Sequence, residues 1–422
     1  MGDAAGAWKL QFALVESHKS PVYGVAFSRH RYGTAGRESS PATAPHASHT
    51  TSPDAAGVVT DTTPSRYHFA LATCGGPGVR VYVASAASPA TRELTLVASH
   101  HDASAKRGGY YACVWTQDEH NGDDLLCAAG ESGQVRVIRV RSDHVVRTLV
   151  GHGGAVNHLC VHPSRPSWLL SAGQDESVRL WDVVTGHCFA MFCGHEGHRG
   201  EVLYCDWHAS GERFLSCGMD GSVRIWRVTE AVQAAFAEQR AAHEGRQQKW
   251  WTTTAIANGF VNGGSKSSPR SRLRTALEQF PESRHQLVHG NYVDCAQWVG
   301  DLVLSKSIHH RLVLWQRGTD ADGYLPSTSE HAVLVEYEYT GGDLWFMRFA
   351  LNADRNTVAV GTQHGAIFVF RVDDVSGKPC AILTHPKATQ PVRQLDFSPD
   401  GRMLLAVCDD CTVWRWDWSD GP

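Results

Sequence analysis

Hydrophobic and polar positions alternate along this chain in short runs, and the arrangement of the runs repeats. The clearest copies are GHGGAVNHLCVHPSRPSWLLSAGQDESVRLWDV at 151–183 and GHRGEVLYCDWHASGERFLSCGMDGSVRIWRV at 197–228. Each has a Gly-His pair, an alternating run, a turn, a second run, an Asp-containing turn and a third run that ends in Trp. Alternation with period two is typical of β-strands, because successive side chains point to opposite faces of a sheet. We therefore interpret the two segments as copies of one β-sheet unit.

The unit resembles the WD40 repeat, which forms one blade of a β-propeller. Weaker copies lie at 21–30 joined to 67–85, 110–140, 289–316, 343–372 and 391–418. Seven units predict an all-β fold, a seven-bladed WD40 β-propeller that spans 1–422 as a single domain. Closure into a ring leaves only short, protected sheet edges. Residues 7–17 precede the first unit, and we expect them to form the outer strand of the last blade.

Four positions repeat in the two clearest units and match the hydrogen-bonded tetrad of WD40 blades. They are His152, Ser171, Asp175 and Trp181, and then His198, Ser216, Asp220 and Trp226. A buried His and a buried Asp each need a partner, and here each can supply the other. Because the set recurs from unit to unit, we interpret it as structural and not as a catalytic triad.

Two insertions interrupt the repeats. Residues 31–66 are rich in Ser, Thr, Pro and Ala and hold almost no large apolar side chains, so we expect a disordered loop. Residues 229–285 begin with good helix formers, which predict a helix with Thr229 as its N-cap. The remainder includes GGSKSSPRSR and is expected to be a basic, flexible loop. We favour a solvated loop, and contact of this loop with nucleic acid is the alternative.

One position in each unit lies where the chain enters the innermost strand of a blade. We aligned the units on the large apolar residue that ends this strand. Counting back four positions from that residue gives Tyr23, Tyr111, Asn157, Leu203, Asp294, Trp345 and Arg393. Such positions rim one mouth of the central channel, where propellers commonly bind ligands. Ring closure makes the first and last units neighbours. Trp345, Arg393, Tyr23 and Tyr111 are therefore predicted to form one arc, with Phe346 beside it.

Clustered aromatic rings at an exposed rim favour a methylated ammonium ligand. Trimethyl-ammonium has no N–H group and is weakly hydrated, whereas the head of an unmodified lysine would lose hydrogen bonds to water that rings cannot replace. The arc therefore predicts an aromatic cage that selects the highest methylation state. The alternative is that the rings only pack the rim of the channel.

Composition argues against several other classes of protein. The 422 residues are 42% hydrophobic with a net charge of −4, so nothing pulls the whole chain strongly toward DNA, RNA or anionic membranes. No apolar run is long enough to span a membrane, and the N-terminal residues lack the features of a secretory signal. The twelve cysteines are scattered, as expected of reduced thiols in a cytosolic or nuclear protein. Cys408 and Cys411 form a CxxC without a second pair to complete a zinc site.

The chain resembles the EED/extra sex combs family, the WD40 subunit of Polycomb repressive complex 2. The resemblance rests on HGNYVDCAQWVGDLVLSKS, EGHRGEVLYCDW with FLSCGMDGSVRIWRV, LWFMRFA and LLAVCDDCTVWRWD, and it weakens only in the insertions. It implies a non-catalytic nuclear scaffold for repressive chromatin. In that family an aromatic cage reads trimethyl-lysine on a histone tail, the product of the complex, and binding stimulates the methyltransferase.

The resemblance also implies roles for particular residues. The family's cage positions fall on Tyr23, Tyr111 and Phe346, with Trp345 as the flanking wall and Arg393 beside the bound peptide. Tyr23 stands where Phe is usual in the animal proteins, and Phe346 where Tyr is usual, so aromatic character is kept at both.

The partners that the resemblance implies are a trimethyl-lysine histone tail, the zinc-finger subunit of the complex and its SET-domain catalytic subunit. A helical segment of the catalytic subunit would occupy a groove on the opposite face and flank. No cofactor, metal, membrane or direct DNA contact is expected.

Two further hypotheses belong to other functional classes. A generic WD40 scaffold, such as a ubiquitin-ligase adaptor, would bind a different peptide, and a basic mouth without an aromatic arc would favour it. An enzyme is the third possibility. The 24 histidines include those of the tetrads, and no HExxH, GxSxG or glycine-rich phosphate loop occurs in a suitable context.

Overall fold

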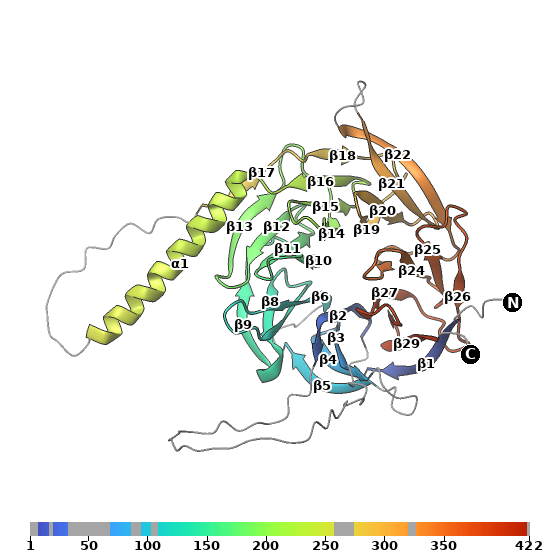
Figure 1. The fold of residues 1–422 in the computed structure, drawn as a ribbon, viewed down its shortest axis with the longest axis horizontal. Coiled ribbons are helices and arrows are strands. Elements are labelled where there is room, and N and C mark those ends of the chain that lie inside the picture. Colours follow the sequence, from blue (N-terminus) through green and yellow to red (C-terminus); the bar gives the residue numbers. More distant parts are fainter. Residues whose placement is uncertain are drawn as a thin grey trace, which may run out of the picture.

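Seven small sheets, antiparallel except for one parallel pair of strands in the third, stand side by side around a central axis, and Figure 1 shows this ring face-on. The computed structural model describes residues 7–16, 20–32, 68–85, 94–102, 109–256, 274–319 and 326–419. Within these ranges the strands build the expected seven-bladed propeller, so the predicted fold class is confirmed.

The first four blades each run outward from an inner strand. Blade 1 contains β2 (Val22–Tyr32), β3 (His68–Gly75), β4 (Gly78–Ser85) and β5 (Leu94–His101). Blade 2 contains β6 (Tyr110–Gln117), β7 (Asp124–Gly130), β8 (Val135–Arg139) and β9 (His144–Leu149). Blade 3 contains β10 (Val156–Val161), β11 (Trp168–Gly173), β12 (Val178–Asp182), β13 (His187–Phe192) and β17 (Ala276–Glu278). Blade 4 contains β14 (Val202–Trp207), β15 (Arg213–Gly218), β16 (Val223–Arg227) and β18 (Ser283–His285).

The last three blades complete the ring. Blade 5 contains β19 (Val293–Val299), β20 (Leu302–Ser307), β21 (Arg311–Thr319) and β22 (Pro326–Glu338). Blade 6 contains β23 (Ala350–Leu351), β24 (Thr357–Gly361), β25 (Ile367–Arg371) and β26 (Ala381–Leu383). Blade 7 contains β27 (Val392–Phe397), β28 (Met403–Cys408), β29 (Thr412–Ser419) and β1 (Ala7–Val15).

The core lies between adjacent blades. All six residues of β14 and all six of β28 are buried, because neighbouring blades cover both faces of these strands. The outermost strand β5 instead has only half-buried and exposed residues, since one side of it faces solvent. Phe192 of blade 3 meets Phe214 of blade 4 edge to face, with ring centroids 4.7 Å apart.

The ring closes through a seam between segments from opposite parts of the chain. β1 pairs antiparallel with β29, from Ala7 opposite Ser419 to Val15 opposite Thr412. The Trp8 ring packs on Phe397 and Trp418, with centroid separations of 5.9 and 5.5 Å. A strand that precedes the first repeat is therefore the outer strand of the last blade, as expected.

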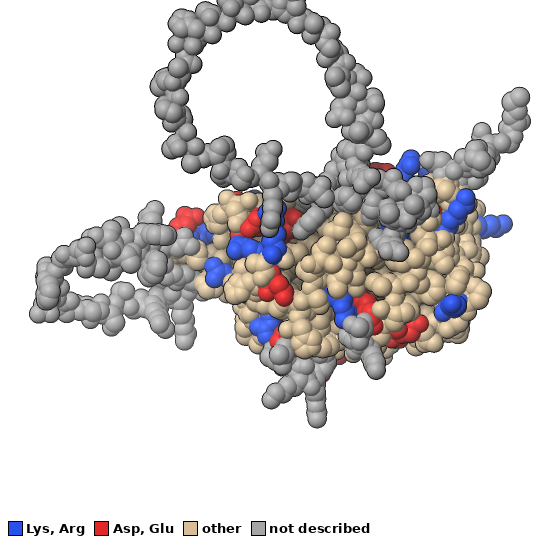
Figure 2. Space-filling model, turned by 90° about the horizontal axis from the view of Figure 1, so that it is seen from below, with Lys and Arg blue, Asp and Glu red and all other residues tan. Residues whose placement is uncertain are grey.

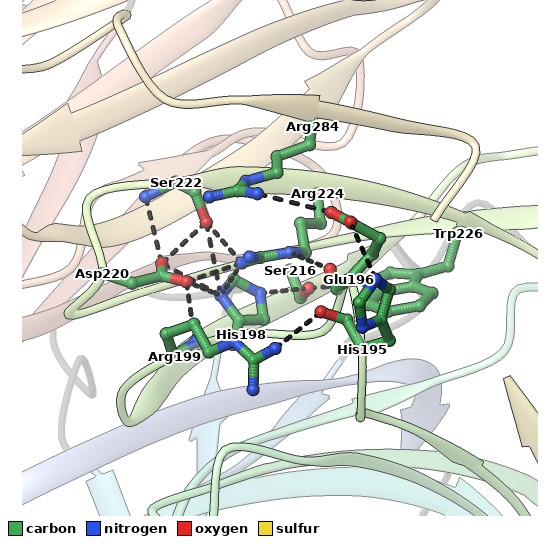
Figure 3. A network of polar contacts seen from close by, with 10 residues as sticks. All are labelled: His195, Glu196, His198, Arg199, Ser216, Asp220, Ser222, Arg224, Trp226 and Arg284. Carbon is green, nitrogen blue, oxygen red and sulfur yellow. Dashed lines mark hydrogen bonds and ion pairs between the residues drawn. The ribbon is translucent and has the colours of Figure 1, made fainter. Parts of the chain in front are cut away.

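Polar tetrads tie the strands of individual blades, and Figure 3 shows the one in blade 4. Trp226 Nε1 donates to Ser216 Oγ at 2.9 Å, Ser216 Oγ lies 2.7 Å from His198 Nε2, and His198 Nδ1 lies 3.1 Å from Asp220. Burial alone would raise the pKa of Asp220, but its bonds to His198 and the charge of Arg224 hold it well below its usual range. The corresponding separations are 2.8, 2.6 and 2.9 Å among Trp181, Ser171, His152 and Asp175.

The second insertion begins with α1 (Glu230–Ile256), which leaves the outer side of blade 3 in Figure 1. Thr229 Oγ1 accepts a hydrogen bond from Val232 N at 3.3 Å, as an N-cap does. Phe236 packs on Trp168 and Phe189, with centroids 5.0 and 5.1 Å away. These contacts anchor the first turns of the helix to the propeller.

The ranges predicted for the insertions differ from the structure at their ends. β2 continues through Tyr32, opposite His68, and the rest of the 31–66 insertion lies outside the described residues. A flexible loop was expected throughout the part of 229–285 that follows the helix. Instead β17 and β18 add strands to blades 3 and 4. Within the described ranges, no helix combines the length and apolar character that crossing a bilayer requires.

Candidate functional site

The inner strands share an irregularity close to the point where each begins. In β2 the pairing with β3 shifts between Val22 and Gly24, and in β6 the pairing with β7 shifts between Tyr110 and Ala112. The skipped residues are Tyr23 and Tyr111. A residue left out of the ladder at a bulge has its side chain re-aimed. The same shift recurs in β10, β14, β19 and β27. Six of the seven positions found by counting in the sequence are therefore bulge residues.

Blade 6 departs from this pattern. Its inner strand is only β23, and the preceding segment has no regular pairing. Phe346 lies in this segment with φ of +63°, in the left-handed region that bulky side chains rarely adopt. Such a backbone costs on the order of 1–3 kcal/mol and persists where the surroundings enforce it. The irregular segment brings the Phe346 ring to the tyrosines of blades 1 and 2.

Three aromatic rings meet where the inner strands begin, at the mouth of the central channel. The Tyr23 and Tyr111 centroids are 5.5 Å apart with an interplanar angle of 78°. Phe346 lies 5.9 Å from Tyr23 at 83° and 5.8 Å from Tyr111 at 76°. Each ring is thus nearly perpendicular to the other two, so the three form the walls of one corner. We call Tyr23, Tyr111 and Phe346 the aromatic triad.

Trp345 stands beside the aromatic triad. Its ring is 5.7 Å from Phe346 at 81°, and 44% of the residue is exposed. Phe346 itself is only 9% exposed. The large Trp345 surface next to the triad is available to a ligand that extends along the rim.

Arg393 borders the aromatic triad on the side of blade 7. Its Nε and Nη2 atoms donate to the two Asp409 carboxylate oxygens, both at 2.6 Å, and its Nη1 donates to the Trp345 carbonyl oxygen at 3.1 Å. The guanidinium carbon lies 6.0 Å from the Tyr23 centroid. Arg393 therefore both neutralises Asp409 and fixes the backbone beside Trp345.

The two tyrosines stay neutral at physiological pH. Burial raises the pKa of Tyr23, although the charge of Arg393 lowers it in part. Burial also raises the pKa of Tyr111. Neutral phenols keep the electron-rich ring faces that attract cations and add no charge of their own.

The remaining rim positions are occupied by internal contacts. Asn157 Nδ2 donates to the Val202 carbonyl oxygen at 3.0 Å. Lys306 Nζ lies 2.9 Å from both carboxylate oxygens of Asp294, and both side chains are fully buried. The structure thus gathers the predicted aromatic residues on one arc. The polar side chains at the rim positions Asn157 and Asp294 are instead taken up by contacts within the protein.

Sequence reasoning missed one residue that touches the aromatic triad. Arg348 is 1% exposed, and its guanidinium carbon lies 4.6 Å from the Phe346 centroid. The available signal was the segment LWFMRFA, where an arginine interrupts an otherwise apolar run.

Comparison with known proteins places this geometry in a family. The model "WD domain, G-beta repeat" matches residues 143–182, 186–227 and 377–417. The maize protein "Polycomb group protein FIE2" is 34% identical over 85% of this chain and 86% of its own length. The Drosophila melanogaster "Polycomb protein esc" is 34% identical over 73% of this chain and 69% of its own. The chain belongs to the esc/FIE family of Polycomb proteins. The family resemblance found in the sequence is therefore confirmed.

Solved structures show that the esc/FIE chain shares its fold with a component of a larger assembly. The match to "Chaetomium thermophilum Polycomb Repressive Complex 2 bound to GSK126" has a TM-score of 0.71 at 17% identity and covers 97% of this chain and 98% of that one. The match to "Structure of ctPRC2 in complex with H3K27me3 and H3K27M" has a TM-score of 0.70 at 16% identity, with the same coverage.

Proposed function

We propose that this esc/FIE protein is a non-catalytic scaffold and histone methyl-lysine reader of a Polycomb-type histone methyltransferase complex. Its ligand is trimethyl-lysine on a histone tail, bound by Tyr23, Tyr111 and Phe346 and flanked by Trp345. The observation that carries the proposal is the mutually perpendicular arrangement of the three rings at the channel mouth.

The geometry of the aromatic triad indicates where the ammonium lies. Because the three centroids are less than 6 Å apart, the centre of the triangle is too narrow for three methyl groups. A cation above the triangle, toward solvent, lies within the ~6 Å range of cation–π attraction of all three rings. Each ring then contributes roughly 0.5–2 kcal/mol.

Arg393 and Trp345 suit the peptide that carries this lysine. The exposed Trp345 ring offers a wall for the aliphatic part of the peptide. Arg393 is partly exposed and held by Asp409, so its position is fixed before the peptide arrives. Pre-ordered side chains lose little conformational entropy on binding.

The absence of catalysis in this proposal rests on the tetrads. Ser171 and Ser216 are each 0% exposed, and each accepts a hydrogen bond from a tryptophan indole. Neither serine can reach a substrate, so these His-Ser-Asp sets hold the blades together.

The proposed cellular setting follows from the family. The protein works in the nucleus, with a SET-domain catalytic subunit and a zinc-finger subunit as partners. Direct DNA binding is not part of the proposal. In the view of Figure 2, acidic and basic side chains of the described residues are interspersed and form no broad basic surface.

Calorimetric titration with histone-tail peptides that differ only in lysine methylation tests the proposal. We expect micromolar binding of the trimethylated peptide and much weaker binding of the unmodified one. Tyr111→Ala or Phe346→Ala each removes one wall, so affinity should fall about tenfold, the equivalent of ~1.4 kcal/mol. Phe280→Ala is the matched control, because Phe280 is a 68% exposed aromatic residue outside the rim column. Equal affinity for unmodified and trimethylated peptides would refute the cage.

A further inference from the structure

Arg348 is a buried side chain that binds residues of several blades. Its Nη1 donates to the Tyr111 carbonyl oxygen at 3.3 Å and to Gln394 Oε1 at 3.0 Å, and its Nη2 donates to the Asn157 carbonyl oxygen. These acceptors come from blades 2, 7 and 3. One side chain that starts in blade 6 thus joins three other blades across the channel.

The same guanidinium also lies close to two aromatic rings. Its carbon is 4.6 Å from the Phe346 centroid and 5.7 Å from the Tyr204 centroid. The backbone is also fixed, because Arg348 N donates to the Arg393 carbonyl oxygen at 2.9 Å. Arg348 therefore contacts the ring of one wall of the aromatic triad and the backbone of another.

The charge of Arg348 has no ion-pair partner in the described part of the chain, and its acceptors are neutral oxygens. The charge of Asp294 reaches Arg348 only at a distance, because the Asp294 carboxylate is paired with Lys306. Burial lowers the pKa of Arg348, yet a guanidinium stays protonated. Burying a charge without a counter-ion is unfavourable for folding, and here the hydrogen bonds that the guanidinium donates to three oxygens offset that cost.

We propose that Arg348 is the positioning residue of the cage. Its planar guanidinium fixes the Phe346 ring relative to the Tyr111 backbone, and so holds the three ring walls in the arrangement that a cation above them would contact. The planar shape of the Arg348 guanidinium matters more than its charge. The lysine of the peptide carries the same positive charge in every methylation state, so the charge of Arg348 cannot distinguish one state from another. This inference rests on the proposed methyl-lysine function.

Arg348→Lys keeps the charge and removes the planar guanidinium, whereas Arg348→Met removes both. We expect either variant to raise the dissociation constant for the trimethylated peptide about tenfold, the usual effect of losing a charged hydrogen bond. The ratio of affinities for trimethylated and unmodified peptide should also fall toward one. If Arg348 acted only by repelling the ligand, Arg348→Met would bind more tightly than wild type, which contradicts positioning.

Calorimetric stoichiometry separates positioning from general loss of structure. A partly unfolded sample gives fewer sites with an unchanged dissociation constant, and that result for Arg348→Lys would overturn the inference. Positioning predicts close to one site with a weaker constant. Arg224→Lys is the matched control, because Arg224 is also buried but pairs with Asp220 of the tetrad in blade 4, away from the aromatic triad. Its dissociation constant should equal that of wild type.

A second variant is needed if Arg348→Lys does not fold. Gln394→Leu removes the amide that accepts from Arg348 Nη1 and should weaken trimethyl-lysine binding in the same direction. Unchanged affinity and selectivity in the Arg348 or Gln394 variants, with wild type selective for trimethyl-lysine, would refute the role of Arg348 alone. A wild-type protein without that selectivity would instead refute the proposed function.

Discussion

The backbone of a single residue, Phe346, decides how the candidate site is built. Counting along regular strands pointed to Trp345 as the rim residue of blade 6. The left-handed conformation at Phe346 places its ring in the aromatic triad and leaves Trp345 outside it. Backbone strain of this kind is common at binding sites.

Asp396 allows a test of electrostatics at the level of one residue. Burial raises the pKa of Asp396 to about 7, even though its carboxylate accepts from Phe27 N at 2.7 Å and Arg29 and Arg355 are near. A folded pKa above the unfolded value of ~3.9 means that folding favours the protonated form. Stability from this group is therefore present at low pH and is lost as the pH rises toward 7.

We expect Asp396→Asn, which stays neutral, to gain roughly 2 kcal/mol of unfolding free energy relative to wild type between about pH 5 and pH 8. This is less than the full ~1.4 kcal/mol per pKa unit, because the residue is partly exposed. Urea unfolding at the two pH values measures the difference. A gap between variant and wild type that does not change with pH would contradict the assignment.

Which residues could be foreseen depends on how regular their strand is. Tyr23 and Tyr111 occupy equivalent bulges in two ordinary inner strands, so counting in the sequence located them. Phe346, which the family resemblance assigned to the cage, and Arg348, which was missed, belong to a segment without regular pairing, where a period of two says nothing about side-chain direction. Their contacts with other blades depend on tertiary packing that no local pattern encodes.

At the scale of elements, repeats were easier to foresee than short strands. The long inner strands and the Trp-ending third strands carry clear alternation. β17 and β18 have three residues each, too few to show a period, and they follow a helix that interrupts the repeat. Their pairing is supplied by the exposed edges of β13 and β16.

The seam strand β1 gives a prediction at this scale. Trp8→Ala removes the contacts with Phe397 and Trp418 and should lower the unfolding free energy by about 2 kcal/mol, less than the 3–5 for a fully buried Trp. Lys9→Ala is the matched control, since Lys9 is exposed on the same strand and should change stability by no more than ~0.5 kcal/mol. Equal urea midpoints for both variants would show that the aromatic packing at the seam does not stabilise the ring.

At the scale of the whole molecule, the propeller can link a rim ligand to a partner only through differences in affinity. If the peptide stimulates the methyltransferase, it must bind the active state of the complex more tightly than the inactive one. The usual coupling of 1–3 kcal/mol corresponds to roughly 5- to 150-fold.

We therefore expect trimethylated peptide to raise the methylation rate of the assembled complex at least about fivefold, with no effect of the unmodified peptide. Phe346→Ala should remove this stimulation, whereas Phe280→Ala should retain it. Methyl transfer to nucleosomes, measured with and without peptide, distinguishes the two. Stimulation that survives in Phe346→Ala would show that the signal does not pass through the cage.

The pairing of β1 with β29 has a consequence for biosynthesis. Blade 7 takes its outermost strand from the beginning of the chain and its other three from the end. The nascent polypeptide must therefore keep Ala7–Val15 unpaired on the ribosome until Thr412–Ser419 has emerged. Domains generally fold as units. Full closure therefore waits until β29 has been synthesised, and a product that terminates before β29 would display an unsatisfied edge that chaperones and proteases can recognise.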